Sequence, residues 1–345
     1  MPDALHPPPP PPPQRQQQQQ LISPLAATLA KIGAQVLVRG WLSANNIVFA
    51  DKLADGRADG AAGRGGSCVV DTGYASHAAQ TGALIEQALA GAPLARVVNT
   101  HLHSDHCGGN ASLARRWPGL HISVPSGYRA WLQPWDEAGL SYQDTDQTCE
   151  PFTPQAFIAA GDSLRLGPRV WQVHAAPGHD PDAVLLFEPR SRTLISGDAL
   201  WERRLAIIFP ELGGEPGFDA AHQALDLIES LAPRLVLPGH GQPFSGVAAA
   251  IDASRQRLRA FAAAPLKHRQ HAARALVSFH MLEHRRRPRR ALLDWIARTP
   301  VFRRAFQCED DPAAARQSAT ATLDRLLADG VLVADGEHIR LASAD

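Results

Sequence analysis

The chain has 345 residues, of which 45% are hydrophobic and 20% charged, and this composition is typical of a globular protein with one large core or with one core and a smaller second domain. Basic and acidic residues number 34 each, so the overall charge does not favour nucleic acid or a membrane surface as a partner. Residues 251–345 nevertheless contain 17 basic and 11 acidic residues, which leaves the preceding part net acidic and indicates two parts with different surfaces.

The N-terminal segment has low complexity. Pro7–Pro13 is an unbroken proline run and Gln16–Gln20 is a glutamine run, and neither composition can build a packed core. We expect residues 1–33 to form a disordered N-terminus and lead-in. The segment lacks the pattern of a signal peptide, and no apolar run in the chain approaches the ~20 residues of a membrane span. Together with four scattered cysteines, this favours a cytoplasmic protein without membrane contact.

Residues 34–250 alternate short apolar runs rich in β-branched residues with stretches that carry apolar residues at helical spacing. This pattern predicts an α/β domain. Three stretches indicate helices: HAAQTGALIEQALA, GNASLARRW and GFDAAHQALDLIESLA. Nine runs indicate strands, each closed by Gly, Pro, Asp or Asn: QVLVRGW, NNIVFAD, SCVVDTG, ARVVNTH, LHISVPS, RVWQVHAAPG, DAVLLFEP, RTLISGD and RLVLPGH.

The stretch NTHLHSDHCGGN, residues 99–110, follows one of these strands and concentrates imidazoles on one loop. His101 and His103 are two residues apart and project to one face if the chain is still extended there. Asp105 and His106 follow after the chain has begun to turn, so they point to a second position nearby. Histidines that merely cap a helix or bond to backbone are the alternative. Four such groups near one point favour metal binding, because neutral imidazole and carboxylate are common zinc ligands.

Three later strand ends offer further ligands. His179 lies in a Pro-Gly turn before a strand, Asp198 follows a strand, and His240 follows another. Each residue alone is weak evidence, because histidine and aspartate are common in glycine turns. After the histidine loop, however, they bring the candidate ligands to seven, which is enough for two metals with open positions for water and substrate.

These motifs, with VVDTG at residues 69–73, resemble those of the metallo-β-lactamase-fold superfamily, and in particular of its glyoxalase II-like members. The resemblance implies a four-layer αβ/βα sandwich with the site at one edge of the two sheets. It implies that Asp71 orders the site from behind the ligands. It also implies a first metal held by His101, His103 and His179, a second held by Asp105, His106 and His240, and Asp198 as the bridge between them.

The implied chemistry is hydrolysis by a hydroxide shared between two zinc ions, with iron or manganese as alternative metals. Asp105 and Asp198 are the expected catalytic carboxylates, and a thioester, lactone or other ester of a small molecule is the expected substrate. Trp201 and Arg203, with Arg204 and Phe209, are expected to line the cleft. Asp198 stands where members that open β-lactams often have cysteine, so a β-lactamase is not expected. A mononuclear iron persulfide dioxygenase remains an alternative.

Residues 251–345 show three helical patterns followed by a hairpin signal around Asp335-Gly336. This order resembles the winged-helix module found in some superfamily members. The arginine-rich run HRRRPRR, residues 284–290, leaves open an endoribonuclease or other phosphodiesterase whose tail binds nucleic acid. Asp324 and Asp329 on the presumed recognition helix oppose that alternative. We therefore rank a lid over the cleft or a homodimer interface above nucleic-acid binding.

Overall fold

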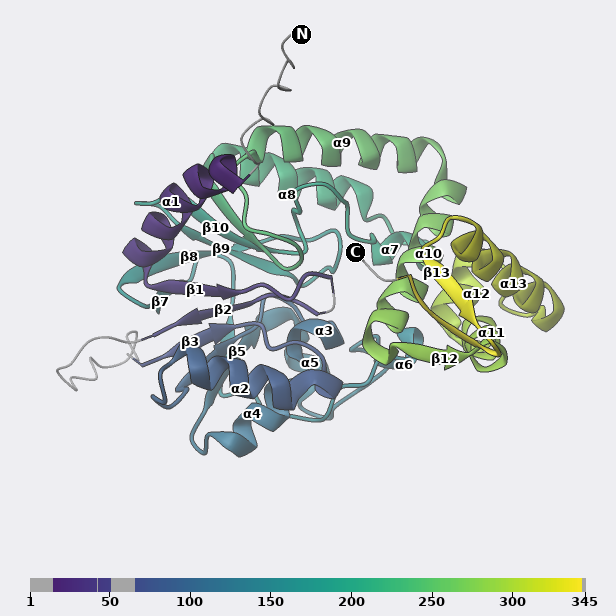
Figure 1. Cartoon of the computed structure of the whole chain (residues 1–345), viewed down its shortest axis with the longest axis horizontal. Coiled ribbons are helices and arrows are strands. Elements are labelled where there is room, and N and C mark those ends of the chain that lie inside the picture. Colours follow the sequence, from purple (N-terminus) through teal and green to yellow (C-terminus); the bar gives the residue numbers. More distant parts are fainter. Residues whose placement is uncertain (1–14, 42, 51–65, 343–345) are drawn as a thin grey trace, which may run out of the picture.

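The structure, a computed structural model, describes residues 15–41, 43–50 and 66–342. Two β-sheets face each other, and helices cover the outer face of each sheet (Figure 1). The described chain thus forms four stacked layers in the order helices, sheet, sheet, helices. The expected α/β class and αβ/βα sandwich are confirmed.

The first sheet contains the strand that leads into the histidine loop. Its pairing is antiparallel from β1 to β3 and parallel from β3 to β6. Because β3, β4 and β5 run in the same direction, the loops that follow them meet at one edge of the sheet. In spatial order the strands are β1 (Ala34–Leu37), β2 (Asn46–Phe49), β3 (Cys68–Val70), β4 (Arg96–Val98), β5 (His121–Pro125) and β6 (Ala156–Ile158).

The second sheet carries the remaining candidate ligands. Strands β8 and β10 both run antiparallel to β9, and β11 is parallel to β10, so the carboxyl ends of β8, β10 and β11 lie at one edge. The sequence does not signal β6 or β7, because each is an edge strand with partly exposed side chains and only a short apolar run. In spatial order the strands are β11 (Leu235–Pro238), β10 (Thr193–Gly197), β9 (Val184–Glu188), β8 (Arg169–Ala175) and β7 (Ser163–Leu166).

The outer helices bury apolar faces against the sheets. Ile85 and Leu113 pack on the outer face of the first sheet, and Leu225 and Leu258 pack on that of the second. The main outer helices are α2 (Ala78–Ala88), α4 (Asn110–Arg116), α8 (Phe218–Leu231) and α9 (Val247–Ala263). Short helices lie in the connections: η1 (Ala75–His77), α3 (Ser104–Cys107), η2 (Ser126–Tyr128), α5 (Arg129–Leu132), α6 (Tyr142–Thr145) and α7 (Phe209–Leu212).

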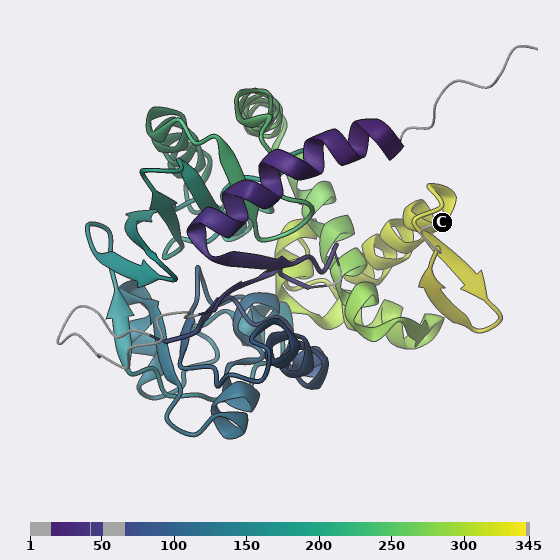
Figure 2. The same cartoon turned by 60° about the vertical axis from the view of Figure 1, so that its left-hand side comes forward.

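The expectation of disorder over residues 1–33 is wrong for its second half. Residues 1–14 lie outside the described residues, but helix α1 runs from Arg15 to Ile32 and lies beside β1 (Figure 2). Glutamine and leucine are good helix formers, and Leu25, Leu29 and Ile32 recur at helical spacing. These three side chains pack against the core between the two sheets. Tertiary packing therefore stabilises a helix that composition alone disguised.

The C-terminal part forms a helical unit at one end of the sandwich (Figure 1). The sequence predicts three helices and a hairpin here, and the structure adds the short helix α12 and the strand β12. The three strands form one sheet in which β14 lies between β12 and β13. Among the described residues, no helix combines the length and the apolar character needed to cross a bilayer. The tail elements are α10 (Pro265–His284), β12 (Arg286–Pro288), α11 (Arg289–Arg298), α12 (Pro300–Phe306), α13 (Pro312–Ala328), β13 (Leu332–Asp335) and β14 (His338–Leu341).

The boundary expected between residues 250 and 251 falls inside helix α9. Ile251 and Leu258 of this helix belong to the core beneath α8, whereas the tail has a core of its own that includes Val277, Leu292 and Phe302. The amphipathic pattern of α9 continues without a break across the expected boundary, so the apolar cores separate only after Ala263.

Candidate metal centre

The histidine loop leaves the carboxyl end of β4 and turns directly into the short helix α3. Asn99 fixes this turn, because its side-chain amide donates to the carbonyl of His106 at 3.0 Å and accepts from the side chain of Asn110 at 2.7 Å. The backbone N–H of Thr72 donates to the same carbonyl of His106 at 2.7 Å. The loops after β3 and β4 therefore hold each other in place.

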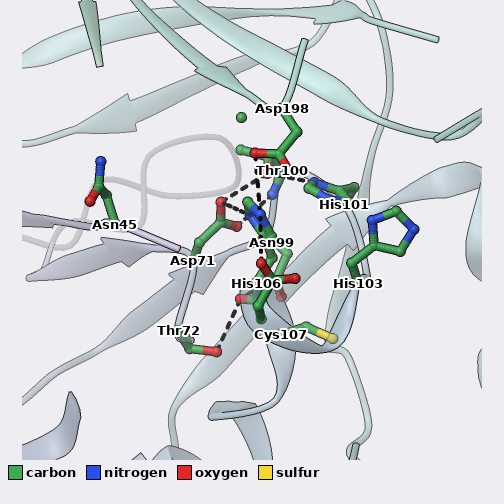
Figure 3. Close-up of polar contacts among 12 residues, drawn as sticks. Asn45, Asp71, Thr72, Asn99, Thr100, His101, His103, His106, Cys107 and Asp198 are labelled. Atoms are coloured by element: carbon green, nitrogen blue, oxygen red, sulfur yellow. Dashed lines mark hydrogen bonds and ion pairs between the residues drawn. The ribbon is translucent and has the colours of Figure 1, made fainter. Parts of the chain in front are cut away.

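Asp71 lies behind the loop with its side chain fully engaged. One carboxylate oxygen accepts from the backbone N–H of Thr100 at 2.9 Å, and the other accepts from Thr100 Oγ1 and from His106 Nδ1, both at 2.8 Å (Figure 3). Asp71 adopts a left-handed backbone conformation with φ of 59°, which is costly for a residue other than glycine. The turn that aims this carboxylate is therefore maintained by its hydrogen bonds.

The other candidate ligands come from the second sheet. His179 follows β8, Asp198 follows β10 and His240 follows β11, so all three lie at the edge where these parallel strands end. The fold brings all seven predicted ligands to one place. Three groups have ligand atoms that all lie within 4.8 Å of one another: His101 with His103 and His179, His101 with His106 and Asp198, and Asp105 with His106 and His240.

Asp198 lies between the two outer groups. Its Oδ1 is 3.4 Å from His106 Nε2, and its Oδ2 is 3.5 Å from His179 Nε2 and 3.7 Å from His240 Nε2. The indole N–H of Trp201 donates to Oδ1 at 3.1 Å and fixes the orientation of the carboxylate. Asp198 can therefore reach a cation in either group.

Hydrogen bonds at Nδ1 determine which nitrogen several histidines present to the centre. His179 Nδ1 lies 2.6 Å from the carbonyl oxygen of Ile207, and His106 Nδ1 is taken by the Asp71 carboxylate. Both partners can only accept, so Nδ1 carries a proton and Nε2 is the nitrogen directed at the centre. His101 Nδ1 is likewise engaged, 3.1 Å from an adjacent hydroxyl. This is the arrangement of metal-bound histidines in proteins.

Buried nitrogen atoms without partners test whether the residues fit a metal. Nε2 of His101 and Nδ1 of His240 are buried without a hydrogen-bond partner in the described chain. Nε2 of His106 and Nε2 of His240 face carboxylate oxygens, 3.4 Å from Asp198 Oδ1 and 3.0 Å from Asp105 Oδ2. Leaving such an atom unsatisfied costs about 1–3 kcal/mol, whereas coordination to a cation would satisfy it. The donor set of imidazoles and carboxylates also suits zinc, so the residues fit divalent cations.

Most charge states at the centre are those that metal binding requires, and His106 is the exception in the metal-free chain. Burial lowers the pKa of His103 and of His179 to about 4, so both rings are neutral near pH 7. Burial raises the pKa of Asp105, but His106 and His240 outweigh it and lower the value to about 2. Burial likewise lowers the pKa of His106, but three surrounding carboxylates, led by Asp198, outweigh it and hold the value well above the ordinary one. A cation would take the place of that proton.

Sequence reasoning missed two residues that support the centre. Asp180 is buried, with its Oδ2 3.7 Å from His103 Nε2, and accepts from the hydroxyl of Tyr128 at 2.5 Å. Its position directly after His179 was the available signal. Trp41 stacks parallel to His240 with ring centroids 5.7 Å apart. No sequence signal marks Trp41, because the loop after β1 reaches His240 only through the fold.

The cleft residues expected after Asp198 are only partly correct. Trp201 and Phe209 line the cavity that contains His103, Asp105 and His179. Arg203 does not, because its side chain is 86% exposed and lies beside Glu202. The loop turns outward at this position, so Arg203 does not line the cavity, and its contact with substrate stays a prediction. Arg204 instead lies over the Trp41 ring, 4.5 Å from its centroid.

The tail supplies a wall of the same cavity. Phe279, His280 and Glu283 of α10 and Trp295 of α11 line it together with the candidate ligands. The Phe279 ring lies 5.4 Å from that of His240, and Glu283 accepts from Ser76 Oγ of the sandwich at 2.8 Å. The tail therefore forms part of the cavity at the candidate metal centre.

Comparison with known proteins identifies the family. A family model described as the metallo-beta-lactamase superfamily matches residues 61–240, just over half of the chain. The chain belongs to the metallo-beta-lactamase superfamily. The expected family is thereby confirmed, and the expected enzyme class, a metal-dependent hydrolase of this superfamily, is supported by the curated relatives.

Two curated relatives and one solved structure illustrate the similarity. The hydroxyacylglutathione hydrolase (glyoxalase II) of Xanthomonas axonopodis pv. citri (strain 306) is 28% identical to this chain. The match covers 67% of this chain and 72% of the relative. The acyl-coenzyme A thioesterase MBLAC2 of Gallus gallus is 25% identical over 43% of this chain and 56% of the relative. The metallo-beta-lactamase family protein TTHA1429 from Thermus thermophilus is 18% identical with a TM-score of 0.52, covering 90% of this chain and 98% of that one. At this identity the last match shows the fold alone, and its coverage extends beyond the sandwich.

Proposed function

We propose that this protein is a dinuclear metal-dependent hydrolase that cleaves a thioester or another ester bond, lactones included, of a small organic substrate. The position of Asp198 carries the proposal, because its carboxylate lies within 4 Å of histidines from both outer ligand groups. We assign His101, His103 and His179 to one zinc ion and Asp105, His106 and His240 to the other, with Asp198 shared. Imidazole and carboxylate ligands in this number support zinc.

Divalent cations in such a site activate water near neutral pH and polarise a carbonyl group. The residues of the chain orient the ligand side chains and accept or release protons. Asp105 Oδ2 lies 3.0 Å from His240 Nε2, and its low pKa leaves it ionised and able to accept a proton at that oxygen. Trp201 keeps Asp198 in one orientation, and the apolar walls of the cavity reduce access of bulk water.

The substrate class rests on the cavity and on the named relatives. One relative is named for hydrolysis of hydroxyacylglutathione and the other for acyl-coenzyme A, and in both compounds an acyl group is bound to a thiol carrier. Aromatic and apolar side chains such as Phe209, Phe279 and Trp295 line the cavity at the metal centre and suit an organic acyl group. These observations support a thioester as the first substrate class to test.

Nucleic-acid cleavage receives less support. In the arginine-rich run, Arg286 pairs with Asp335 at 3.0 Å and Arg289 pairs with Asp324 at 2.8 Å, so these cations already have partners within the tail. We propose a winged-helix module for the tail, supported by its order of helices and its three-stranded sheet, that serves as a lid. All four cysteines are free thiols, which supports the proposed cytoplasmic location.

The test is metal content followed by an assay panel on the same sample. Full-length protein purified without chelator should contain about two zinc ions per chain and should hydrolyse acyl thioesters or lactones. Removing the metal with a chelator should abolish turnover, and adding zinc should restore it. One iron per chain with oxygen uptake on a persulfide would overturn the proposal in favour of a dioxygenase, and cleavage of single-stranded RNA alone would overturn the substrate class.

A further inference from the structure

A second, larger cavity adjoins the metal centre on the side of the tail. It has a volume of about 950 Å³ and lies between the loop after Asp198 and helices α10, α12 and α13. No candidate metal ligand lines it. Its size is at the upper end of the range for small-molecule sites.

Three aromatic side chains connect this chamber to the metal centre. Trp41, Trp201 and Phe279 line the chamber, and each also packs against His240, with ring centroids 5.7, 5.3 and 5.4 Å from that imidazole. We call these three residues the aromatic collar. Trp201 and Phe279 line the cavity at the metal centre as well. A molecule in the chamber therefore lies next to the proposed reaction site.

The interior of the chamber is mainly apolar. The side of α10 that faces it carries Ala275, Phe279 and Leu282, which are only half-buried. The residues that α10 buries in the tail core, such as Val277 and Met281, do not line the chamber. Leu205 and Leu326, which are themselves buried, complete the apolar lining from the opposite elements. Half-buried leucine and phenylalanine facing a cavity provide contact area for an apolar ligand.

The charged residues of the chamber all have one sign. Arg204, Lys267, Arg274 and Arg325 line it, and no aspartate or glutamate does so among the described residues. Arg274 and Arg325 are engaged with Asp329. Lys267 and Arg204 form no ion pair within the described chain, and Arg204 lies on the collar. The rim therefore favours an anion, and Lys267 is the cation free to bind one.

The length of the chamber follows from helix geometry. Lys267 and Phe279 are twelve positions apart on α10, so the solvent-exposed cation and the collar are separated by ~18 Å along the helix. This span matches a long aliphatic chain rather than a compact metabolite.

We propose that the chamber binds the apolar acyl chain of the substrate, with an anionic group of the ligand at Lys267 and the scissile end passing the collar to the metal centre. This inference rests on the proposed function, which it makes specific. A carboxylate and a phosphate have the same charge sign here, and the probes below distinguish them.

The test measures binding of non-hydrolysable probes to the full chain. Dodecanoate, dodecyl phosphate and uncharged dodecanol compete against 11-(dansylamino)undecanoate, followed by its fluorescence, with and without chelator. We expect an anionic probe to bind better than dodecanol in both conditions. Lys267→Glu should weaken binding of the anions about tenfold, because attraction becomes repulsion. Lys31→Glu on α1 is the matched control and should change nothing.

Blocking the chamber provides a second readout. Ala275→Trp should abolish probe binding, and Ala321→Trp, at an exposed lining position of α13, tests the same point with less risk to folding. Binding that disappears with chelator, or that survives both the Lys267 and the tryptophan variants, would overturn the inference. Hydrolysis of short thioesters without probe binding would overturn the chamber but leave the proposed function standing. Probe binding without hydrolysis of any thioester would overturn the proposed function but leave the chamber standing as a binding site.

Discussion

The sandwich and the tail contribute to the same cavity in different ways. The sandwich places its ligands on loops that follow strand ends, and backbone hydrogen bonds and buried side chains such as Asn99 and Asp71 fix each loop. The tail contributes side chains from α10 and the Trp295 ring from α11, held by the packing of the tail core and by contacts such as Ser76 with Glu283.

This difference separates two kinds of role. A ligand must be positioned within a fraction of an ångström, and a loop at a strand end with several hydrogen bonds provides that precision. A wall needs shape and apolar surface, which a helix face provides with more tolerance. Changes in the sandwich should therefore affect metal binding, and changes in the tail should affect substrate use.

The largest expected effect is that of His103→Ala. Its ring approaches His179, with 2.9 Å between Nδ1 and Nε2, so removing it opens one of the proposed zinc sites. We expect most bound metal and all hydrolysis above background to be lost, with the circular dichroism spectrum unchanged. His222→Ala on the outer helix α8 is the matched control. Turnover retained by His103→Ala would contradict the dinuclear assignment.

Asp71→Asn should act on the metal without removing a ligand. An amide has one accepting oxygen instead of two, so it cannot accept from the backbone N–H of Thr100 and from His106 Nδ1 at the same time. With the oxygen toward the Thr100 N–H, His106 loses its orienting partner. Such substitutions typically lower metal affinity about 10- to 100-fold. Competition with a fluorescent zinc chelator measures this loss, and Asp252→Asn on α9 serves as control. Unchanged affinity would mean that the turn after β3 orders the loop through its backbone alone.

The sequence reveals the metal centre better than the tail because of this same difference. Ligands such as His101 and His179 follow apolar strands in glycine-rich turns, and both features are local in the sequence. Trp41 and Asp180 support the centre through contacts made only in the fold, and the outward turn of Arg203 depends on loop geometry. Composition also misleads at α1, where packing against the inter-sheet core stabilises a helix in a segment expected to be disordered.

Phe279→Ala should change substrate use and leave the metal in place. The ring lies against His240 and lines both cavities, so its loss removes apolar contact surface but no ligand. A half-buried phenylalanine contributes on the order of 1.4 kcal/mol, so KM for an acyl thioester should rise about tenfold. Leu266→Ala, an exposed position of the same helix, is the control. Loss of bound zinc in Phe279→Ala would show that the tail also maintains the centre.

Acid should destabilise the tail through His280. Burial lowers the pKa of this ring from an ordinary value of 6.5 to about 3, so the folded state keeps it neutral while the unfolded chain binds a proton below pH 6.5. The stability that the neutral His280 ring provides is fully present above pH 6.5 and is lost as the pH falls toward 3. At pH 5 the loss is on the order of 1–2 kcal/mol.

Urea unfolding of metal-free protein at pH 7 and pH 5 measures this loss. His280→Phe keeps the stacking ring against Trp295, where the centroids are 3.8 Å apart, and removes a buried Nε2 that has no partner in the described chain. The variant should therefore lose less stability than the wild type between the two pH values. His338→Phe in the hairpin should behave like the wild type. Equal losses in all three proteins would place the acid sensitivity elsewhere.

The smallest expected effect distinguishes a lid from a nucleic-acid module. Arg289 and Asp324 pair at 2.8 Å with both side chains about half exposed, so solvent screens the pair. Arg289→Ala should change the free energy of unfolding by about 0–1 kcal/mol. If the tail is a lid, neither this variant nor Arg286→Ala should alter thioester turnover, and the wild type should bind single-stranded RNA weakly, without dependence on either arginine. The opposite result would be a wild type that binds RNA with a salt dependence that each substitution reduces. That result would show that both arginines contact phosphates, and that their ion pairs with Asp324 and Asp335 break when RNA binds.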